Sequence, residues 1–404
     1  MNTSEAALAG LDVPALQRHF ERHVPECAGR LRFELLHGGR SNLTYHVTDG
    51  THRWVLRRPP LGVLTPTAHD MDLAEIERPI PREAEVLIRV EAAGLCHSDV
   101  HVVDAAAGTL PYHPPFTLGH EVAGHVAALG PTADGTAIGE RVVIHGPWGC
   151  GSCARCATGR DNYCDRRGEL SWHGAGLGRD GGMADYVLVP SARHLVPIGD
   201  LGADQAAPLS DAGLTSYHAI AGLRHALGEG GTAVVIGIGG LGHLAVQILR
   251  ATTPSRVLAV DIHEGALALA DRSGAHFGTL LREDTARVLR NQAGGVGVDA
   301  VLDFVGDTAT LELAAATLRP GGELALVGSG GGQLTVRKPG FLPPGFRLSL
   351  PFWGTRPELA DVIALARSGA LRIETNHSPL SAAPQAFDRI RQGGVRGRVV
   401  LVPD

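Results

Sequence analysis

Thiol, imidazole and carboxylate groups gather in one short stretch, which runs from Gly94 to Glu121. It holds Cys96 and His120, whose side chains are ligand types that zinc prefers. Asp99 and Glu121 lie close enough in sequence to supply carboxylates that orient a ligating imidazole. Taken singly, such a cysteine or histidine could as well be an ordinary buried residue. Together they predict part of a catalytic zinc site.

Four more cysteines form a second cluster, in which Cys150, Cys153 and Cys156 are followed by Cys164 after seven intervening residues. Four thiolates close a tetrahedral shell around zinc and leave no position for substrate, so we expect a structural zinc site. An iron–sulfur cluster begins with the same C-x2-C-x2-C spacing, but there the fourth cysteine follows more closely and a proline comes after it. Disulfides are disfavoured because the chain shows no export signal.

A Gly-rich turn follows the apolar run from Ala233 to Ile236, and helical spacing resumes from Leu244 to Leu249. A strand, a G-x-G-x-x-G turn and a helix in this order are typical of a dinucleotide site, where the backbone approaches a pyrophosphate at the helix N-terminus. The turn residues that we expect to bind the cofactor are Gly237, Gly239, Gly240, Leu241 and Gly242.

Asp261 ends the next apolar run, nineteen residues after Gly242. Its carboxylate can accept hydrogen bonds from the adenosine ribose and would repel a 2′-phosphate, so NAD is favoured over NADP. The alternative is that Asp261 only caps a helix or lies in a solvated turn. Further strand-like runs at 300–304 and 323–327 alternate with helical stretches, which predicts a doubly wound α/β sheet.

Composition bounds the class of partner. The 404 residues suffice for two or three domains, and the formal net charge of -6 comes without a basic run. Neither nucleic acid nor an anionic membrane is therefore an expected partner, and a small molecule is. The N-terminus shows no secretory signal, so we expect a cytoplasmic protein with reduced thiols.

Residues 1–71 differ from the rest of the chain. A helical pattern over Leu16, Phe20 and Val24 precedes strand-like runs at 31–36, 44–47 and 54–56. In "HGGRSNLTYHVTDG" and "RWVLRRPPLG" the segment resembles the start of the aminoglycoside-phosphotransferase-like kinases. The resemblance implies a phosphate-covering turn at 38–42, with Arg57 in the place of the phosphate-pairing lysine.

A phosphoryl transferase also needs a nucleophile-orienting carboxylate and metal ligands, and the chain changes character near Met71 before any appear. We therefore expect a short α+β appendage, like a truncated kinase small lobe, and keep a nucleotide-binding phosphotransferase as an alternative function.

From Asp72 to Asp404 the chain resembles the zinc-dependent medium-chain alcohol dehydrogenases, particularly bacterial enzymes acting on secondary alcohols. The resemblance implies a β-rich, GroES-like catalytic domain over 72–210, with strands expected at 73–77 and 85–90. It also implies a Rossmann-type NAD domain over 211–354 and a return to the catalytic domain over 355–404. One departure is that the family's usual additional strand before "LAEIERPIP" is missing or replaced.

The resemblance assigns roles around the zinc site. It implies that Cys96 and His120 are ligands, that Asp99 supports His120, and that Glu121 can approach the metal transiently. The remaining residues with implied roles surround substrate and cofactor: Ser98 and His101 carry the substrate proton outward, His97 lies near the pyrophosphate, Thr215 near the nicotinamide, and Arg356 at a cofactor phosphate. Tyr112 and Trp353 are candidate pocket walls, although core packing explains them nearly as well.

The third catalytic ligand is Asp211 by this resemblance, since many relatives carry a cysteine at its position in "PLSDAGLTSYHAI". A carboxylate oxygen is an accepted zinc ligand, and an open site needs three protein ligands. The alternative is that Asp211 only caps the helix beginning near Ala212, in which case Glu121 is the fallback ligand.

The predicted function is an NAD-dependent alcohol dehydrogenase with one catalytic and one structural zinc, converting an alcohol, preferentially a secondary one, to a ketone or aldehyde. We expect a homodimer or homotetramer. Besides the phosphotransferase, a catalytically inactive, zinc-stabilised dinucleotide-binding protein is the alternative.

Overall fold

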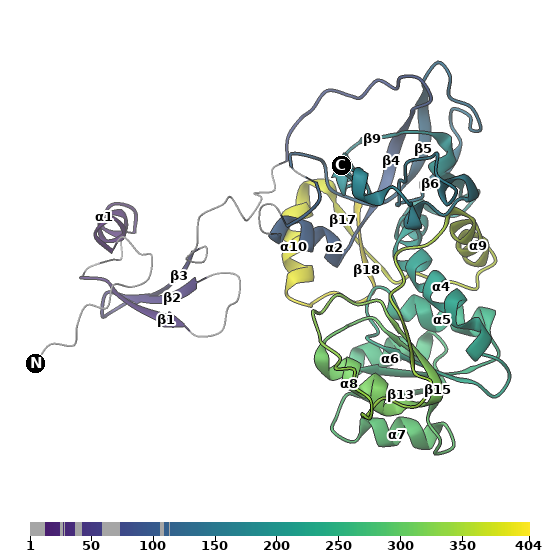
Figure 1. The fold of residues 1–404 in the computed structure, drawn as a ribbon. Helices are drawn as coiled ribbons and strands as arrows, with labels where there is room; N and C mark the ends of the chain where they lie inside the picture. The colour runs from purple at the N-terminus through teal and green to yellow at the C-terminus, as the bar shows by residue number, and fades with distance from the viewer. Residues whose placement is uncertain are drawn as a thin grey trace, which may run out of the picture. The chain divides into compact units, whose positions relative to one another are not determined.

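The computed structural model describes residues 13–24, 27, 29–36, 43–58, 73–105, 109–112 and 114–404. The chain divides into two compact units, Met1–Thr67 and Ala68–Asp404 (Figure 1). The larger unit contains both zinc-type clusters and the Gly-rich turn.

The smaller unit is one helix and one antiparallel sheet in the order β1-β2-β3. Its elements are α1 (Val13–His23), β1 (Arg32–Leu36), β2 (Leu43–Thr48) and β3 (Arg53–Arg58). Phe20, Leu31 and Val47 form its small buried core. The predicted helix and three strands are thus confirmed. The predicted phosphate-covering turn, residues 38–42, lies outside the described residues, as does the side chain of Arg57.

The first sheet of the larger unit is mostly antiparallel, in the order β10-β6-β5-β4-β18-β17, with β9 also paired to β4. Its strands are β4 (Val86–Leu95), β5 (Glu121–Leu129), β6 (Arg141–Ile144), β9 (Tyr186–Val189), β10 (Leu195–Pro197), β17 (Thr375–Pro379) and β18 (Arg398–Val402). Because β18 pairs with β4, the end of the chain completes the sheet that begins the unit.

The strand predicted over 73–77 is wrong, because residues 73–80 form no regular element. Leu73 and Ile76 remain 59% and 64% exposed, so the segment buries little apolar surface against the sheet. Extended backbone needs a hydrogen-bonding neighbour to become a strand. The departure noted in the sequence before "LAEIERPIP" is consistent with a neighbour being missing here.

The second sheet is parallel throughout, in the order β13-β12-β11-β14-β15-β16. This is the doubly wound order 3-2-1-4-5-6 and confirms the predicted fold class. Its strands are β11 (Thr232–Ile236), β12 (Arg256–Asp261), β13 (Phe277–Leu280), β14 (Val298–Asp303), β15 (Leu318–Leu326) and β16 (Arg347–Ser349), and its helices are α5 (Gly242–Thr252), α6 (Glu264–Arg272), α7 (Thr285–Gln292) and α8 (Thr308–Thr317).

Other helices connect the two sheets or cover the first. They are α2 (His97–Asp104), α3 (Ala203–Ala206), α4 (Ala212–Leu223), α9 (Arg356–Arg367) and α10 (Ala383–Arg391), with short 3-10 turns that include η5 (Ala207–Ser210). The strands of the first sheet come from the ranges assigned to the catalytic domain, and those of the second from the range assigned to the cofactor domain. The domain boundaries at 210 and 354 stay predictions.

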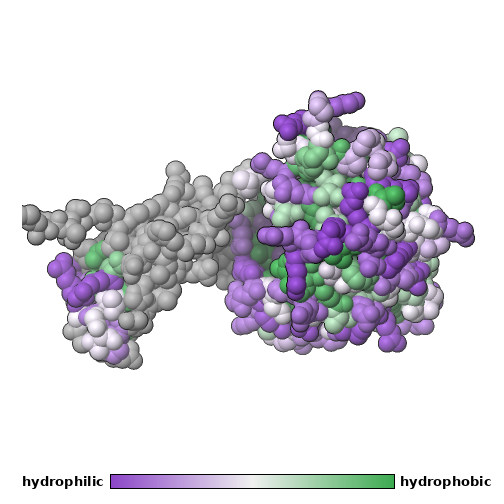
Figure 2. Space-filling model, turned by 90° about the horizontal axis from the view of Figure 1, so that it is seen from below, coloured by the Kyte–Doolittle hydropathy of each residue, from purple (hydrophilic) through white to green (hydrophobic). Residues whose placement is uncertain are grey.

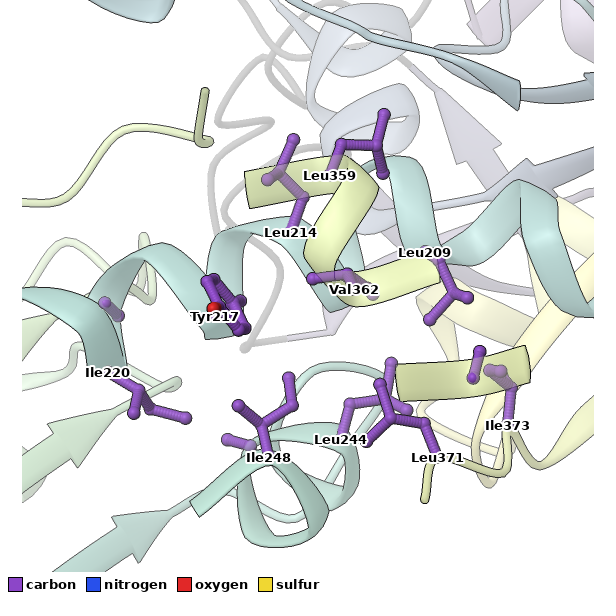
Figure 3. Close-up of a cluster of buried hydrophobic side chains, with 14 of the residues drawn as sticks. Leu209, Leu214, Tyr217, Ile220, Leu244, Ile248, Leu359, Val362, Leu371 and Ile373 are labelled. Carbon is purple, nitrogen blue, oxygen red and sulfur yellow. The ribbon is translucent and has the colours of Figure 1, made fainter. Parts of the chain in front are cut away.

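An apolar cluster fixes α4 between α5 and α9 (Figure 3). Leu214 and Ile220 of α4 are fully buried, as are Leu244 of α5 and Leu359 of α9. Each such side chain contributes about 1.5–3 kcal/mol by leaving water. This packing holds the start of α4, and with it Asp211, at a defined position beside the Gly-rich turn's helix.

Within the described residues, no helix is both long and apolar enough to cross a membrane.

Candidate active site

The pairing of β4 with β5 brings the two halves of the predicted zinc site together. Cys96 follows β4 at the start of α2, and His120 immediately precedes β5. Gly94 is opposite Glu121 in the register of the pair. A β-carbon at Gly94 would overlap the Glu121 Oε2 atom, so only glycine leaves room for this carboxylate.

Four candidate ligand atoms converge here, from Cys96, His120, Glu121 and Asp211, all within 4.8 Å of one another. Asp211 Oδ2 lies 3.5 Å from Cys96 Sγ and 3.6 Å from His120 Nε2. Tetrahedral zinc with bonds of about 2.0–2.3 Å places its ligand atoms roughly 3.3–3.8 Å apart. The spacing and the mixed sulfur, nitrogen and oxygen donors therefore fit a catalytic zinc ion.

Asp211 does not act as a helix cap. It precedes α4, but its side chain makes no capping hydrogen bond. Instead its Oδ1 accepts a hydrogen bond from the Thr215 hydroxyl at 3.0 Å, which leaves Oδ2 directed at Cys96 and His120. The capping alternative is therefore not supported, and Asp211 stays our preferred third ligand.

Asp99 supports two of the candidate ligands through hydrogen bonds. Its Oδ1 lies 3.0 Å from His120 Nδ1, and its Oδ2 accepts a hydrogen bond from the Cys96 backbone N–H at 2.9 Å. One buried carboxylate thus orients both ligating residues. Because Nδ1 bonds to Asp99, Nε2 is the ring nitrogen that faces Asp211 and can bind a metal.

The electrostatics of the cluster favour a cation. Burial alone would lower the pKa of His120, but the carboxylates of Asp99 and Asp211 outweigh burial and raise it well above its ordinary value. Burial would likewise raise the pKa of Asp211, yet contact with His120 lowers it to about 2. Two carboxylates around one imidazole demand positive charge, which a divalent metal supplies.

Arg398 lies between the zinc-type cluster and the Gly-rich turn, and sequence reasoning missed it. It starts β18 and forms a buried ion pair with Glu121 Oε1. A β-carbon at Gly240 would come within 2.8 Å of the Arg398 Cδ and Nη1 atoms, so the same side chain lies against the Gly-rich turn. No motif marks Arg398, because its partner is 277 residues away.

The predicted proton-carrying residues lie on α2. Ser98 Oγ is 3.7 Å from Cys96 Sγ, and Ser98 and His101 are both exposed. His97 is exposed as well, and burial of part of its ring, with His101 and Arg398 nearby, lowers its pKa. Thr215 lies one turn into α4, bonded to Asp211. The structure therefore brings Ser98 and Thr215 into contact with candidate zinc ligands and places His97 and His101 on the same helix as Ser98, while their roles stay predictions.

The two candidate pocket walls flank His120. The Trp353 ring packs edge-to-face on His120 at a centroid distance of 5.7 Å, and its indole N–H donates to the Ser210 carbonyl. Trp353 has a positive φ of 53°, a strained conformation for a bulky residue. Tyr112 is buried, and His120 is among the charges acting on its hydroxyl.

The four cysteines of the second cluster also converge, with their sulfur atoms within 4.8 Å of one another. Cys153 Sγ and Cys164 Sγ are 4.0 Å apart, which is far too long for a disulfide. The backbone N–H groups of Cys150, Cys153 and Cys156 point at sulfur atoms of the cluster at 3.4–3.5 Å. Such donors stabilise thiolates, so the cluster fits a structural zinc ion.

The Gly-rich turn lies between β11 and α5, as predicted. Gly237 has a φ of 84°, and a β-carbon at Gly242 would overlap the Gly237 carbonyl, so both positions require glycine. Asp261, at the end of β12, accepts hydrogen bonds from the backbone N–H groups of Ile238 and His263. It therefore supports the turn, and its remaining lone pairs are available for a ribose.

Arg356 makes its side-chain hydrogen bonds with the first sheet. Its guanidinium donates to the Leu195 carbonyl at 2.8 and 3.2 Å, at the end of the first sheet. The predicted contact of Arg356 with a cofactor phosphate stays a prediction. Arg398 is the guanidinium that meets the turn.

The doubly wound sheet, the Gly-rich turn and the two metal-type clusters together define a zinc-dependent dinucleotide oxidoreductase. Residues 82–200 match the alcohol dehydrogenase GroES-like domain, and residues 240–368 match the zinc-binding dehydrogenase domain. The chain belongs to the zinc-dependent medium-chain alcohol dehydrogenase family.

Individual relatives agree. The chain is 34% identical to an NAD-dependent alcohol dehydrogenase of Sulfurisphaera tokodaii, over 82% of this chain and 96% of the relative. It is 33% identical to an alcohol dehydrogenase of Geobacillus stearothermophilus, over 83% and 96%. Among solved structures, the alcohol dehydrogenase of Aeropyrum pernix is similar with a TM-score of 0.75 and 32% identity, over 82% and 96%. The acetophenone reductase of Geotrichum candidum, solved with NAD, has a TM-score of 0.69 and 30% identity, over 91% and 98%.

Proposed function

We propose that the chain is an NAD-dependent dehydrogenase of secondary alcohols whose catalytic zinc is held by Cys96, His120 and Asp211. The observation that carries this proposal is the convergence of these three side chains, with Asp211 Oδ2 at 3.5–3.6 Å from the other two ligand atoms. Glu121 is a fourth, reserve donor: its Oε2 is buried and has no hydrogen-bond partner among the described residues.

The bound cofactors supply the reactive chemistry, zinc by polarising the alcohol oxygen and NAD by accepting hydride. The chain's own residues orient the site and carry the alcohol proton to solvent. Asp99 fixes His120 with Nε2 toward the site. The Ser98 hydroxyl can receive the alcohol proton, and exposed His101 lies three residues further along the same helix, where it can exchange the proton with water near neutral pH.

A secondary alcohol is the proposed substrate class because two large rings border the site. Trp353 lies against His120, and Tyr112 is held by edge-to-face contacts with Phe116 and His173. Such walls can discriminate between the two carbon substituents of a secondary alcohol. The relative named acetophenone reductase acts on a ketone, and reduction of a ketone gives a secondary alcohol.

A homodimer or homotetramer and a cytoplasmic location belong to the same proposal. Strand β16 ends the parallel sheet, and no strand pairs with its outer edge among the described residues. Exposed apolar side chains accompany this edge at Leu348, Leu350 and Phe352. Other apolar side chains reach the surface on the face seen in Figure 2. An open edge with apolar neighbours favours pairing with a second copy. Light scattering measures the oligomeric state, and a monomer in solution would contradict the proposed homo-oligomer.

The activity is tested by NAD reduction with matched secondary and primary alcohols, with and without a chelator. We expect higher kcat/KM for the secondary alcohols and loss of activity with the chelator. Equal or greater kcat/KM for primary alcohols would contradict the substrate class, and activity that survives complete removal of the metal would contradict the catalytic zinc.

A further inference from the structure

His243 is a buried histidine that the proposed mechanism does not use. It is the second residue of α5, directly after the Gly-rich turn, and is fully buried. Its Nδ1 atom lies 2.8 Å from the carbonyl oxygen of Gly239 in the turn. The backbone N–H of His243 reaches the same oxygen at 3.3 Å. The Gly239 carbonyl is therefore held from two directions by one residue.

The protonation of this imidazole is determined by its surroundings. A carbonyl oxygen can only accept, so Nδ1 must carry the hydrogen. The other nitrogen, Nε2, is buried and has no hydrogen-bond partner within the described part of the chain. Burial lowers the pKa of His243 to about 4. The positive charge of Arg398 also lowers this pKa, whereas the bond to the Gly239 carbonyl raises it. The ring is thus a neutral donor at neutral pH.

The bond to Gly239 also fixes the next N–H group. In a trans peptide the carbonyl of Gly239 and the N–H of Gly240 point in opposite directions. Because the carbonyl is drawn toward α5, the Gly240 N–H is turned away from His243. A β-carbon at Gly239 would meet nothing within 4 Å, so the turn borders open space at this point. A glycine peptide that lacked this anchor could rotate at little steric cost.

We propose that His243 is a positioning residue for the cofactor: its Nδ1–H bond to Gly239 holds the turn in the conformation that presents backbone N–H groups to the pyrophosphate of a dinucleotide. The inference rests on the proposed NAD dependence. Preorganised donors bind an anion without the cost of ordering the turn. Loss of the bond should therefore weaken cofactor binding while the zinc cluster and the chemical step are unaffected.

The test compares variants by calorimetric titration of NAD into the zinc-loaded protein. His243→Phe keeps most of the volume without a donor, and His243→Asn keeps a donor. Loss of one hydrogen bond predicts an NAD Kd raised roughly two- to tenfold in His243→Phe, with kcat at saturating NAD unchanged. His243→Asn should recover part of the affinity. If His243→Phe does not fold, His243→Ala replaces it in the comparison with His243→Asn.

Thr252→Val is the matched control, since it removes another side-chain bond to a carbonyl four residues back, at the far end of the same helix. It should leave the NAD Kd unchanged. A His243→Phe or His243→Ala protein that binds NAD as the wild type does would overturn the role of His243. A wild-type protein that binds no NAD would instead overturn the proposed function.

Discussion

Arg398 and Glu121 form a buried ion pair that joins the two sites of the enzyme. Burial raises the pKa of Glu121 to about 7, against the attraction of Arg398. One end of the Arg398 side chain meets the carboxylate beside the zinc cluster, and its Cδ and Nη1 atoms approach Gly240 of the cofactor turn. The metal site and the cofactor site therefore share one guanidinium.

We expect Arg398→Leu to be strongly destabilising, because it leaves Glu121 buried without its counter-charge. Removal of one partner from a buried pair costs about 3–5 kcal/mol of the free energy of unfolding. Arg391→Leu is the control, since its pair with Asp104 is largely exposed and such pairs contribute about 0–1 kcal/mol. Urea unfolding measures both. Similar losses of unfolding free energy in the two variants would show that the buried pair stabilises the protein no more than the exposed pair does.

Asp261→Asn should relax the preference for NAD over NADP. The amide oxygen can still accept the hydrogen bond from the Ile238 N–H of the turn, although the bond from the His263 N–H is lost, and the neutral side chain no longer repels a 2′-phosphate. Charges about 4 Å apart near a surface interact by roughly 1–4 kcal/mol, so the ratio of kcat/KM values should shift about fivefold or more. Asp271→Asn, an exposed change on the following helix, is the control. If the ratio of the kcat/KM values for NAD and NADP is unchanged in Asp261→Asn, then Asp261 does not determine the cofactor preference.

Asp99→Ala should weaken zinc binding although Asp99 is not a ligand. It removes the acceptor for both His120 Nδ1 and the Cys96 N–H, so neither ligand is held in place. Loss of such a supporting carboxylate typically costs 10–100-fold in metal affinity. Competition with a chromogenic chelator measures it, with exposed Asp104→Ala on the same helix as control. Wild-type affinity in Asp99→Ala would refute this supporting role.

His145 should make the enzyme less stable in mild acid. Burial lowers its pKa from 6.5 to about 4 in the folded protein. Between these values the unfolded chain binds a proton that the folded protein does not, so stability rises with pH and falls on acidification. From about pH 7 to about pH 5 the wild type should lose about 2 kcal/mol more than His145→Gln.

Urea midpoints at the two pH values measure this difference, and His377→Gln serves as control because its ring is half exposed. Equal acid sensitivity of the wild type and His145→Gln would show that His145 is not the responsible group.

Features with a local pattern could be predicted from the sequence. The four-cysteine cluster and the Gly-rich turn after β11 both lie where spacing or periodicity placed them. Asp211 could be proposed only through resemblance, because a single aspartate before a helix looks like a cap. The structure supplies what the pattern lacked, namely the direction of its Oδ2 atom.

Features that depend on long-range neighbours could not be predicted from the sequence. The segment from Leu73 has strand-like composition, but a strand needs a partner that composition does not reveal. Arg398 lies against the Gly-rich turn because β18, at the far end of the chain, pairs with β4. The phosphate contact expected of Arg356 stays a prediction.

The zinc content of the purified protein tests the central claim most directly. We predict two zinc ions per chain in the wild type, one in Cys96→Ala and one in Asp211→Ala, with alcohol-dependent NAD reduction lost in Cys96→Ala. Exposed Asp271→Ala should retain both ions. A wild-type protein that holds a single zinc ion even in zinc-rich buffer, and the same content in Cys96→Ala, would contradict the catalytic site described here.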